Sequence, residues 1–475
     1  MSDATTAPTT SMSSVESFWT RTRKSPISAA CVVAYTLFTD MLTYGAVLPV
    51  LPTLVLQRLH GNSSMVGILF GVYAFGLLLA TPVFAILSDK YQNRRYPMMT
   101  GCIGLVASTL AFAAADSYFL LILARIAQGV AGGASWTIGL GMVADVFPTN
   151  RLGVVMGTVL TAHTVGFAIG PAMGGFLFEY AGFSAPFLCC AIFAAINFLA
   201  VAWVAEPNHD KHINKKDTDK YTQPTADNTS ETSTAASTSS HVTDDEALAA
   251  VTPTEETPLI KSTSRPLGDQ TQEITMWGLC KNWKIMCCVL CTTISASVFS
   301  GIEPALPIHL EKAYDSSAST VGVIFVAMVV PAFLAPAIGF MSDRIGRDVI
   351  SASGMLLMAV AAPLVSIDYP IVYMIVPSLM VFGFSSPLTL TPILPEMGEI
   401  VDSLGGAAYA QVYALYNMAY SMGMFLGPVY AGAVMAVAGF KTLMFTFAIA
   451  LVICSPVMMD WKAVWRRVTA CVRSH

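Results

Sequence analysis

Residues 166–175 read GFAIGPAMGG, and residues 423–432 read GMFLGPVYAG. Each copy begins with a glycine, has a Gly-Pro pair at its centre, ends in another glycine and lies within a long apolar stretch. Glycines at this spacing let a second helix approach closely, and a proline inside a helix opens the backbone hydrogen-bond ladder. The two copies therefore predict a chain of two related halves, each built of closely packed membrane helices.

The composition agrees with a membrane protein. Hydrophobic residues make up 55% of the 475 residues and charged residues only 12%, whereas a soluble protein carries about 25% charged residues. So little charge cannot cover the surface of a water-soluble enzyme of this length. The net charge of −5 gives no sign of a nucleic-acid partner.

The apolar stretches predict twelve spans in two sets of six, because a spanning helix needs about 20 apolar residues. We expect an all-α integral membrane protein with an N-terminal bundle at 28–204 and a C-terminal bundle at 284–460. Between them, residues 205–283 are rich in Ser, Thr, Asp and Lys, which predicts a disordered linker. Residues 1–27 and 461–475 are the two tails.

The positive charges predict the orientation. Lys and Arg near the span ends gather on the side of the tails and the linker, although the loop Glu396–Asp402 on that side is acidic. Cytoplasmic loops carry the excess of Lys and Arg in membrane proteins, and acidic residues contribute little to this bias. Both termini and the linker are therefore predicted to be cytoplasmic in a multi-pass membrane protein.

Two further pairs of motifs repeat between the halves. FAILSDKYQNRR at 84–95 resembles GFMSDRIGRD at 339–348, and GAVLPVLP at 45–52 resembles GIEPALPIHL at 301–310. Paired halves suit alternating access, in which two bundles rock around a site at their interface. In these motifs both halves of the sequence resemble the major facilitator superfamily, which implies the fold of that family and a transport function.

The motif in the fifth span resembles the glycine–proline motif of proton-coupled exporters in that superfamily. Its members here are Gly157, Gly166, Gly170, Pro171, Gly174 and Gly175. The resemblance implies an antiporter of the exporter branch. The alternative is a packing face with a kink that never contacts substrate.

The charged loops after the second and eighth spans are candidate gates. An Asp at a helix end can accept hydrogen bonds from a neighbouring helix N-terminus and pair with Arg, and such contacts must break when the conformation changes. By resemblance, Arg151 supplies a partner from the next loop; the alternative is that the arginines only set the orientation. The candidates are Asp89, Arg94, Arg95, Arg151, Asp343, Arg344 and Arg347.

Three ionisable residues inside the spans are the candidates for proton coupling. Arg125 lies in ARIAQGVAGG, which resembles the buried-arginine motif that the superfamily links to proton transfer. Asp40 lies in LFTDMLTYGAVLPVLP, which resembles the first span of vesicular amine transporters and their fungal relatives, where the acid binds substrate or protons. Glu303 precedes Pro304, where a broken helix would expose it. Charged groups inside a membrane are costly and usually functional.

The candidate substrate cavity contains Tyr73, His163, Tyr413 and Asn417. Two of these positions depart from the amine transporters, which have an acid at the place of Asn417 and a Lys at the place of Tyr73. The deep charges of both signs therefore allow a neutral compound or an organic acid as well as an amine. Ordinary packing is the alternative for each of these side chains.

We therefore expect a proton antiporter that exports a small organic metabolite and needs no cofactor beyond the proton gradient. The second possibility is a vesicular or vacuolar amine–proton exchanger, and the third is a non-transporting sensor on a transporter scaffold. We do not expect an enzyme, which is the least favoured class, because the sequence has no nucleophile elbow, metal cluster or phosphate loop. The expected partners are a small-molecule substrate and the lipid bilayer, and the expected state is a monomer.

Two short motifs concern location. Asn62 begins a glycosylation sequon in the first non-cytoplasmic loop. Residues Glu255–Ile260 resemble an acidic dileucine signal that a sorting adaptor would read, although such short matches are common by chance. The plasma membrane is the expected location, with a vacuolar or vesicular membrane as the alternative.

Overall fold

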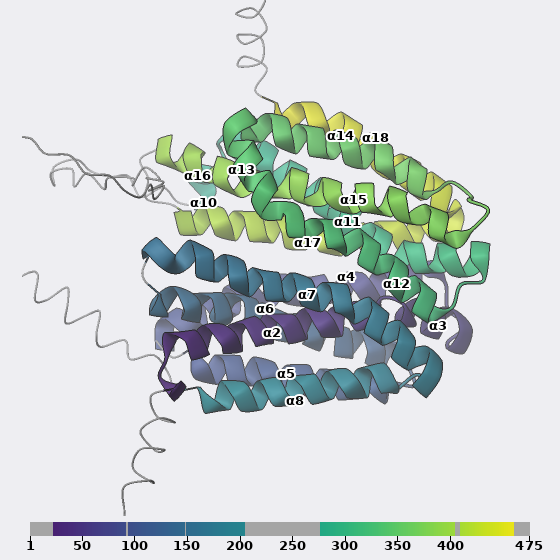
Figure 1. Ribbon diagram of the computed structural model, residues 1–475, viewed down its shortest axis with the longest axis horizontal. Coiled ribbons are helices and arrows are strands. Elements are labelled where there is room, and N and C mark those ends of the chain that lie inside the picture. Colours follow the sequence, from purple (N-terminus) through teal and green to yellow (C-terminus); the bar gives the residue numbers. More distant parts are fainter. Residues whose placement is uncertain (1–21, 92–93, 148, 205–275, 404–408, 460–475) are drawn as a thin grey trace, which may run out of the picture. The chain divides into compact units, whose positions relative to one another are not determined.

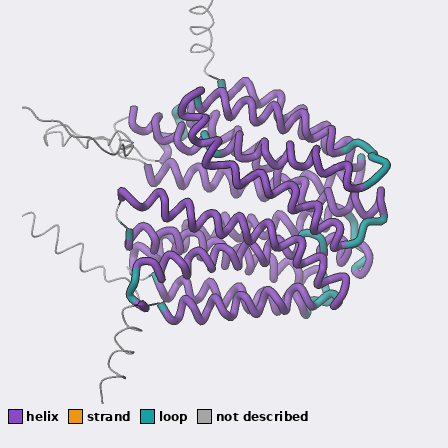
Figure 2. Tube along the Cα trace, viewed as in Figure 1, coloured by secondary structure: helices purple, strands orange, loops and turns teal. Residues whose placement is uncertain are grey.

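The computed structural model describes residues 22–91, 94–147, 149–204, 276–403 and 409–459. These residues form helices joined by short loops, and no strand occurs among them (Figure 2). Within the described ranges, twelve helical segments are long and apolar enough to cross a membrane. The predicted fold class of an all-α protein with twelve spans is confirmed.

The first six spans are continuous helices, apart from the first, which has two short extensions (Figure 1). Their bounds are α2 Pro26–Val47 with α3 Val50–Thr53 and the π-helical turn η1 Leu54–Arg58, α4 Ser63–Tyr91, α5 Arg95–Ala113, α6 Tyr118–Val146, α7 Thr149–Ala181 and α8 Ala185–Trp203.

The second six spans are interrupted more often, at the eighth and tenth spans. Their bounds are α11 Trp283–Tyr314, α12 Ala318–Val329 with the 3-10 turn η2 Val330–Leu334 and α13 Ala335–Ile345, α14 Arg347–Val365, η3 Val372–Ile375 with α15 Val376–Leu390 and α16 Ile393–Ser403, α17 Tyr409–Val437, and α18 Gly439–Met458. A short helix, α10 Met276–Leu279, lies inside the range predicted as linker, where Leu279 is fully buried.

Local sequence explains where several helices begin. Ser117 accepts a hydrogen bond from the backbone N–H of Leu120 at the start of α6, and Asn282 and Ser317 cap α11 and α12 in the same way. These caps satisfy N–H groups that have no partner within the helix. The outward faces carry exposed apolar side chains such as Ile86 and Ile453, which suit contact with lipid.

The glycine–proline repeat makes the same contacts in each half. A Cβ atom on Gly170 would lie 2.8 Å from the carbonyl oxygen of Leu42 in α2, and one on Gly166 would overlap the carbonyl of Phe38. In the second half, Gly423 and Gly427 lie equally close to the backbone of α11. The first and fifth positions of the motif therefore hold the fifth span of each half against the first span of the same half.

The sixth and tenth positions of the repeat face the opposite half. The carbonyl of Pro171 abuts Gly322 of α12, and the carbonyl of Pro428 abuts Gly67 of α4. The sequence around these two glycines also repeats, as VGILF at 66–70 and VGVIF at 321–325. The two crossings between the halves, α7 with α12 and α4 with α17, are thus built from equivalent residues.

Gly157 differs from the other glycines of its motif. It is exposed, and a Cβ atom there would meet no other atom within 4 Å in the described part of the chain. The prediction of a close helix approach is wrong at this position, because Gly157 lies on a different side of α7 from the α2 contact. The spacing of glycines does not show which side of a helix has a neighbour.

The apolar core is shared between the halves over part of their length. One cluster joins α3 and α4 residues such as Leu51 and Phe70 to α11 and α12 residues such as Leu306 and Phe325. The first half has a second cluster of its own around Val33 and other residues near the start of α2. The shared core therefore lies in the middle of the spans and toward the loops around residues 60 and 315.

Candidate functional site

The structure brings Asp40, Arg125 and Glu303 into one buried region between the halves. Their exposed fractions are 1%, 0% and 2%, and they come from α2, α6 and α11. Each ionised group at such a depth costs several kcal/mol unless it is compensated. The way these three are connected therefore decides what the site can do.

Two tyrosines connect the carboxyl groups. The hydroxyl of Tyr44 donates a hydrogen bond to Oε2 of Glu303, and the hydroxyl of Tyr73 donates a long one of 3.5 Å to Oδ2 of Asp40. The two rings lie 4.8 Å apart between centroids. Because Tyr44 belongs to the first half and Glu303 to the second, their hydrogen bond crosses the interface.

Arg125 is held by aromatic rings. Its guanidinium carbon lies 5.4–5.8 Å from the ring centroids of Tyr44, Phe70, Tyr73 and Phe112. A desolvated cation–π contact is worth about 2 kcal/mol, so the rings partly replace lost hydration. Nη1 also donates to Oε1 of Gln128 at 3.2 Å.

The cluster keeps unused hydrogen-bonding capacity. Nε and Nη2 of Arg125 and Oδ1 of Asp40 have no partner among the described residues. Gly132 forms the wall beside them, because a Cβ atom there would lie 2.9 Å from the Tyr73 hydroxyl and 3.1 Å from Oδ2 of Asp40. Buried polar atoms normally find a partner, so these atoms can hold water, a proton or a polar substrate group.

Two of the other predicted cavity residues, His163 and Asn417, make no described contact with this cluster. His163 is half-buried, and its ring packs edge-on against Trp136 with centroids 4.8 Å apart. Asn417 is exposed on α17, and the side chain of Tyr413 lies outside the described residues. Tyr420, one further turn along α17, lies within electrostatic range of Glu303. Of the three predicted residues whose side chains are described, Tyr73 alone belongs to the cluster.

Sequence reasoning missed Tyr44. A usable signal existed, because Tyr44 follows Asp40 by four residues and side chains at that spacing share one face of a helix. Phe70 and Phe112 had no such signal, since an apolar ring in a span reads as packing.

The candidate gate of the first half is an ion pair at the start of α5. Arg94 pairs with Asp145 near the end of α6 through Nε, and its Nη2 donates to Oδ1 at 3.3 Å. Arg95 donates to the backbone carbonyl of Ala202 at the end of α8. Asp145 was not predicted as a partner, because only the three-dimensional fold brings it beside the loop.

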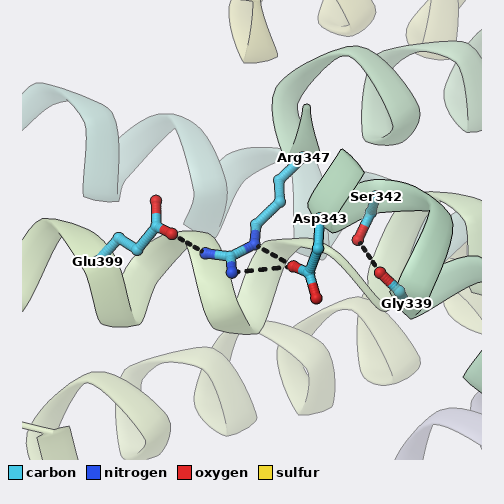
Figure 3. A network of polar contacts seen from close by, with 5 residues as sticks. All are labelled: Gly339, Ser342, Asp343, Arg347 and Glu399. Atoms are coloured by element: carbon cyan, nitrogen blue, oxygen red, sulfur yellow. Dashed lines mark hydrogen bonds and ion pairs between the residues drawn. The ribbon is translucent and has the colours of Figure 1, made fainter. Parts of the chain in front are cut away.

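The second half has the equivalent pair. Arg347 at the start of α14 contacts Asp343 at 2.9 Å and Glu399 of α16 at 2.6 Å (Figure 3). Glu399 lies in the acidic stretch that disagreed with the orientation rule, and its partner shows why an acid is there. Each half thus joins the start of its third span to the end of its fourth span by an Arg–carboxylate pair.

The remaining gate candidates are less connected. Arg344 lies 4.2 Å from the ring centroid of Phe340, and Arg151 is exposed. The side chain of Asp89 lies outside the described residues. A contact between Asp89 and Arg151 stays a prediction.

Replacing Asp145 by Asn should destabilise the protein slightly more than replacing Asp116, which pairs with Arg58 in an exposed position. The side chains of Arg94 and Asp145 are 24% and 30% exposed, against 54% and 84% for the exposed pair. We expect about 1 kcal/mol for Asp145→Asn and essentially no change for Asp116→Asn. Thermal unfolding in detergent measures both, and equal shifts would contradict a structural role for the Arg94 pair.

Polar contacts also join the halves near the loops around residues 60 and 315. Gln57 donates to Oε1 of Glu311 at 2.5 Å. Glu179, at the end of α7, accepts from the hydroxyl of Ser319 at 2.5 Å and from its backbone N–H at 3.2 Å. The latter places a carboxylate at the N-terminus of α12, where the helix dipole favours negative charge. These contacts close one end of the interface.

Comparisons with known proteins give a consistent result. The profile of the Major Facilitator Superfamily matches residues 33–276 and 288–469. An uncharacterized MFS-type transporter of Schizosaccharomyces pombe is 25% identical over 433 residues, covering 87% of this chain and 91% of that protein. The human synaptic vesicular amine transporter is 25% identical over 402 residues, covering 84% of this chain and 67% of that protein.

Solved structures show the same fold. A bacterial homologue of the human lysosomal transporter Spinster, in an inward-facing and unoccupied conformation, matches with a TM-score of 0.68 at 14% identity. The match covers 91% of this chain and 96% of the other. Twelve spans, two halves with equivalent contacts and the profile match over nearly the whole length agree, and the chain belongs to the Major Facilitator Superfamily of membrane transporters.

Proposed function

We propose that this transporter exports a small organic metabolite from the cytosol in exchange for protons. The observation that supports it best is the buried cluster of Asp40, Glu303 and Arg125, whose members come from both halves and are joined by Tyr44 and Tyr73. The glycine–proline motif, by its resemblance to the exporter branch, supports the direction of transport. No cofactor takes part besides the proton gradient.

The net charge of the buried cluster suggests how proton binding is coupled to the access state. Two carboxylates and one guanidinium carry a net charge of −1, and the set becomes neutral when one carboxyl takes a proton. One unit of buried charge alters both the cost of burying the cluster and the strength of the hydrogen bonds that its carboxyls accept. Binding and release of one proton therefore changes the relative free energy of the two access states, which is what antiport requires.

The contacts between the halves indicate the access state. Gln57–Glu311 and Glu179–Ser319 close the end near residues 60 and 315. In the orientation expected from the Lys and Arg distribution, this end is the non-cytoplasmic one. We propose that the structure is closed to the outside, and that the pairs of Arg94 and Arg347 move with their own halves when the transporter changes state.

The cluster suits two substrate classes. Unpartnered N–H groups of Arg125 suit the carboxylate of an organic acid, and this is our first choice. The second candidate is an amine, because two carboxyls and several rings also suit a cation and because a synaptic vesicular amine transporter is among the relatives. That function would place the protein in a vesicular or vacuolar membrane rather than the plasma membrane.

Metabolite profiling separates these possibilities. Cells that lack the protein should accumulate one organic acid or a related metabolite internally and lose it from the medium. Re-expression of the wild type should restore export. Accumulation of an amine in an internal compartment that depends on the protein would instead favour the amine exchanger. Purified protein that binds the compound without moving it into or out of liposomes would favour a non-transporting sensor.

Asn62 is the candidate glycosylation site. It is exposed, and its Oδ1 caps α4 by accepting from the backbone N–H of Met65 at 3.0 Å, which leaves Nδ2 available. Asn62→Gln should remove a glycosidase-sensitive mobility shift on a gel. An unshifted wild-type band would contradict glycosylation. The sorting motif at Glu255–Ile260 lies outside the described residues, and adaptor binding and a monomeric state remain proposals.

A further inference from the structure

Tyr44 is buried, with an exposed fraction of 3%, and makes the one described side-chain hydrogen bond that joins the buried cluster across the two halves. We propose that Tyr44 is a positioning residue through which the charge of Glu303 controls the contact between the halves. This inference rests on the proposed proton coupling. It adds the residue through which protonation of Glu303 changes the contact between the two halves.

The hydrogen bond depends on the charge of its acceptor. A phenol hydroxyl donates more strongly to a carboxylate than to a neutral carboxyl, and charge-assisted hydrogen bonds are roughly twice as strong as neutral ones. When Glu303 is ionised, Tyr44 therefore holds α2 against α11. When Glu303 takes a proton, the hold weakens and the halves can separate at this point.

The groups around Glu303 do not replace this contact. The ionisable side chains that face it are Tyr44 of α2, Tyr73 of α4, Arg125 of α6 and Tyr420 of α17. Arg125 is the cation of this set, but its described hydrogen bond goes to Gln128. Tyr420 belongs to the same half as Glu303, so it cannot join the halves through that residue.

The position of Tyr44 connects this contact to the helix crossings. The next residue, Gly45, packs against α7, where a Cβ atom on it would lie 2.9 Å from Cδ of Pro171 and 3.2 Å from Cα of Gly170. The carbonyl of Pro171 in turn abuts Gly322 of α12 in the other half. A shift of α2 at Tyr44 therefore acts directly on the crossing of α7 with α12.

Tyr73 provides a matched control. Its hydroxyl also donates to a buried carboxylate, but Tyr73 and Asp40 belong to the same half. Replacing either tyrosine by Phe keeps the ring and its contact with Arg125 while removing one hydroxyl. Only Tyr44→Phe removes a hydrogen bond between the halves.

The test measures the distance between the halves as a function of pH. The protein is full-length, has its accessible native cysteines replaced by Ser, and carries spin labels at Tyr180→Cys and Lys312→Cys. Pulsed electron paramagnetic resonance in nanodiscs then measures the distance between the two labels at the end near residue 315. In otherwise wild-type protein, we expect the short-distance population to be largest at high pH and to decrease as the pH falls, because Glu303 takes a proton. Tyr44→Phe should lower the ratio of short to long distances about tenfold at high pH, equivalent to about 1.4 kcal/mol, and remove its pH dependence.

Two further variants separate the role of Tyr44 from the proposed proton site at Glu303. Tyr73→Phe should keep the pH response, and Glu303→Gln should lose it. If Glu303→Gln loses the response while Tyr44→Phe keeps it, this inference is wrong and the proposed proton site stands. If Glu303→Gln keeps the response, the proposed proton site itself fails. Should Tyr44→Phe not fold, a fluorotyrosine at position 44, which donates more strongly, must increase the short-distance population at high pH; no change would overturn the proposal.

Discussion

Replacing Glu303 by Gln should abolish transport driven by a pH gradient while leaving exchange of substrate for substrate in place. Gln has nearly the same shape and can still accept a hydrogen bond from Tyr44, but it cannot take or release a proton. In proteoliposomes loaded with the exported metabolite, we expect concentrative transport under an imposed pH gradient to fall at least about a hundredfold, corresponding to about 2.7 kcal/mol of lost coupling. Counterflow with labelled and unlabelled substrate should remain within about threefold of the wild type.

Asp368→Asn is the matched control for this charge change. Asp368 lies in the exposed loop before η3 and accepts a hydrogen bond of 2.6 Å from Lys441, which lowers the pKa of its carboxyl. It is therefore ionised throughout the working pH range and contributes no transported proton. Equal loss of gradient-driven transport in both variants would contradict the assignment of Glu303.

Replacing Gly166 by Ala should destabilise the bundle, whereas replacing Gly157 by Ala should not. A Cβ atom at position 166 would overlap the carbonyl of Phe38, which belongs to the backbone of α2 and cannot rotate away. Overpacking of this kind costs about 1–3 kcal/mol. Position 157 is open in the described structure, and Ala is the better helix former by up to about 1 kcal/mol.

Thermal unfolding of the two purified variants in detergent measures this difference. We expect a clearly lower midpoint for Gly166→Ala and a midpoint equal to or above the wild type for Gly157→Ala. A lower midpoint for Gly157→Ala, equal to that of Gly166→Ala, would show that the motif acts through something other than the α2–α7 contact.

These two glycines also show which features of the helix packing can be predicted from the sequence and which cannot. Both belong to one motif, and the motif with its second copy at 423–432 is sufficient to predict two related membrane halves. Which glycine meets a neighbour depends on the side of α7 that faces α2, and this direction is set by the packing of the whole bundle. The spacing of the glycines therefore does not predict which side of α7 faces α2.

In the buried cluster, too, some residues could be predicted from the sequence and others could not. Asp40, Arg125 and Glu303 could be found because charges inside apolar spans are rare and costly. The spacing of Tyr44 from Asp40 places both on one face of α2, but it does not reveal the partner of Tyr44, which is more than two hundred positions away in the chain. Asp145 and Glu399 were missed for the same reason, because a surface acid gains its partner only when the helices assemble.

Movement of protons coupled to movement of substrate is the most direct test of the central claim. Proteoliposomes containing the wild-type protein and a trapped pH-sensitive dye can be prepared without any initial pH difference. When the exported metabolite is added on one side, we predict that protons move in the opposite direction to the metabolite and that Glu303→Gln shows no such movement. Metabolite transport by the wild-type protein without any proton movement would contradict the account.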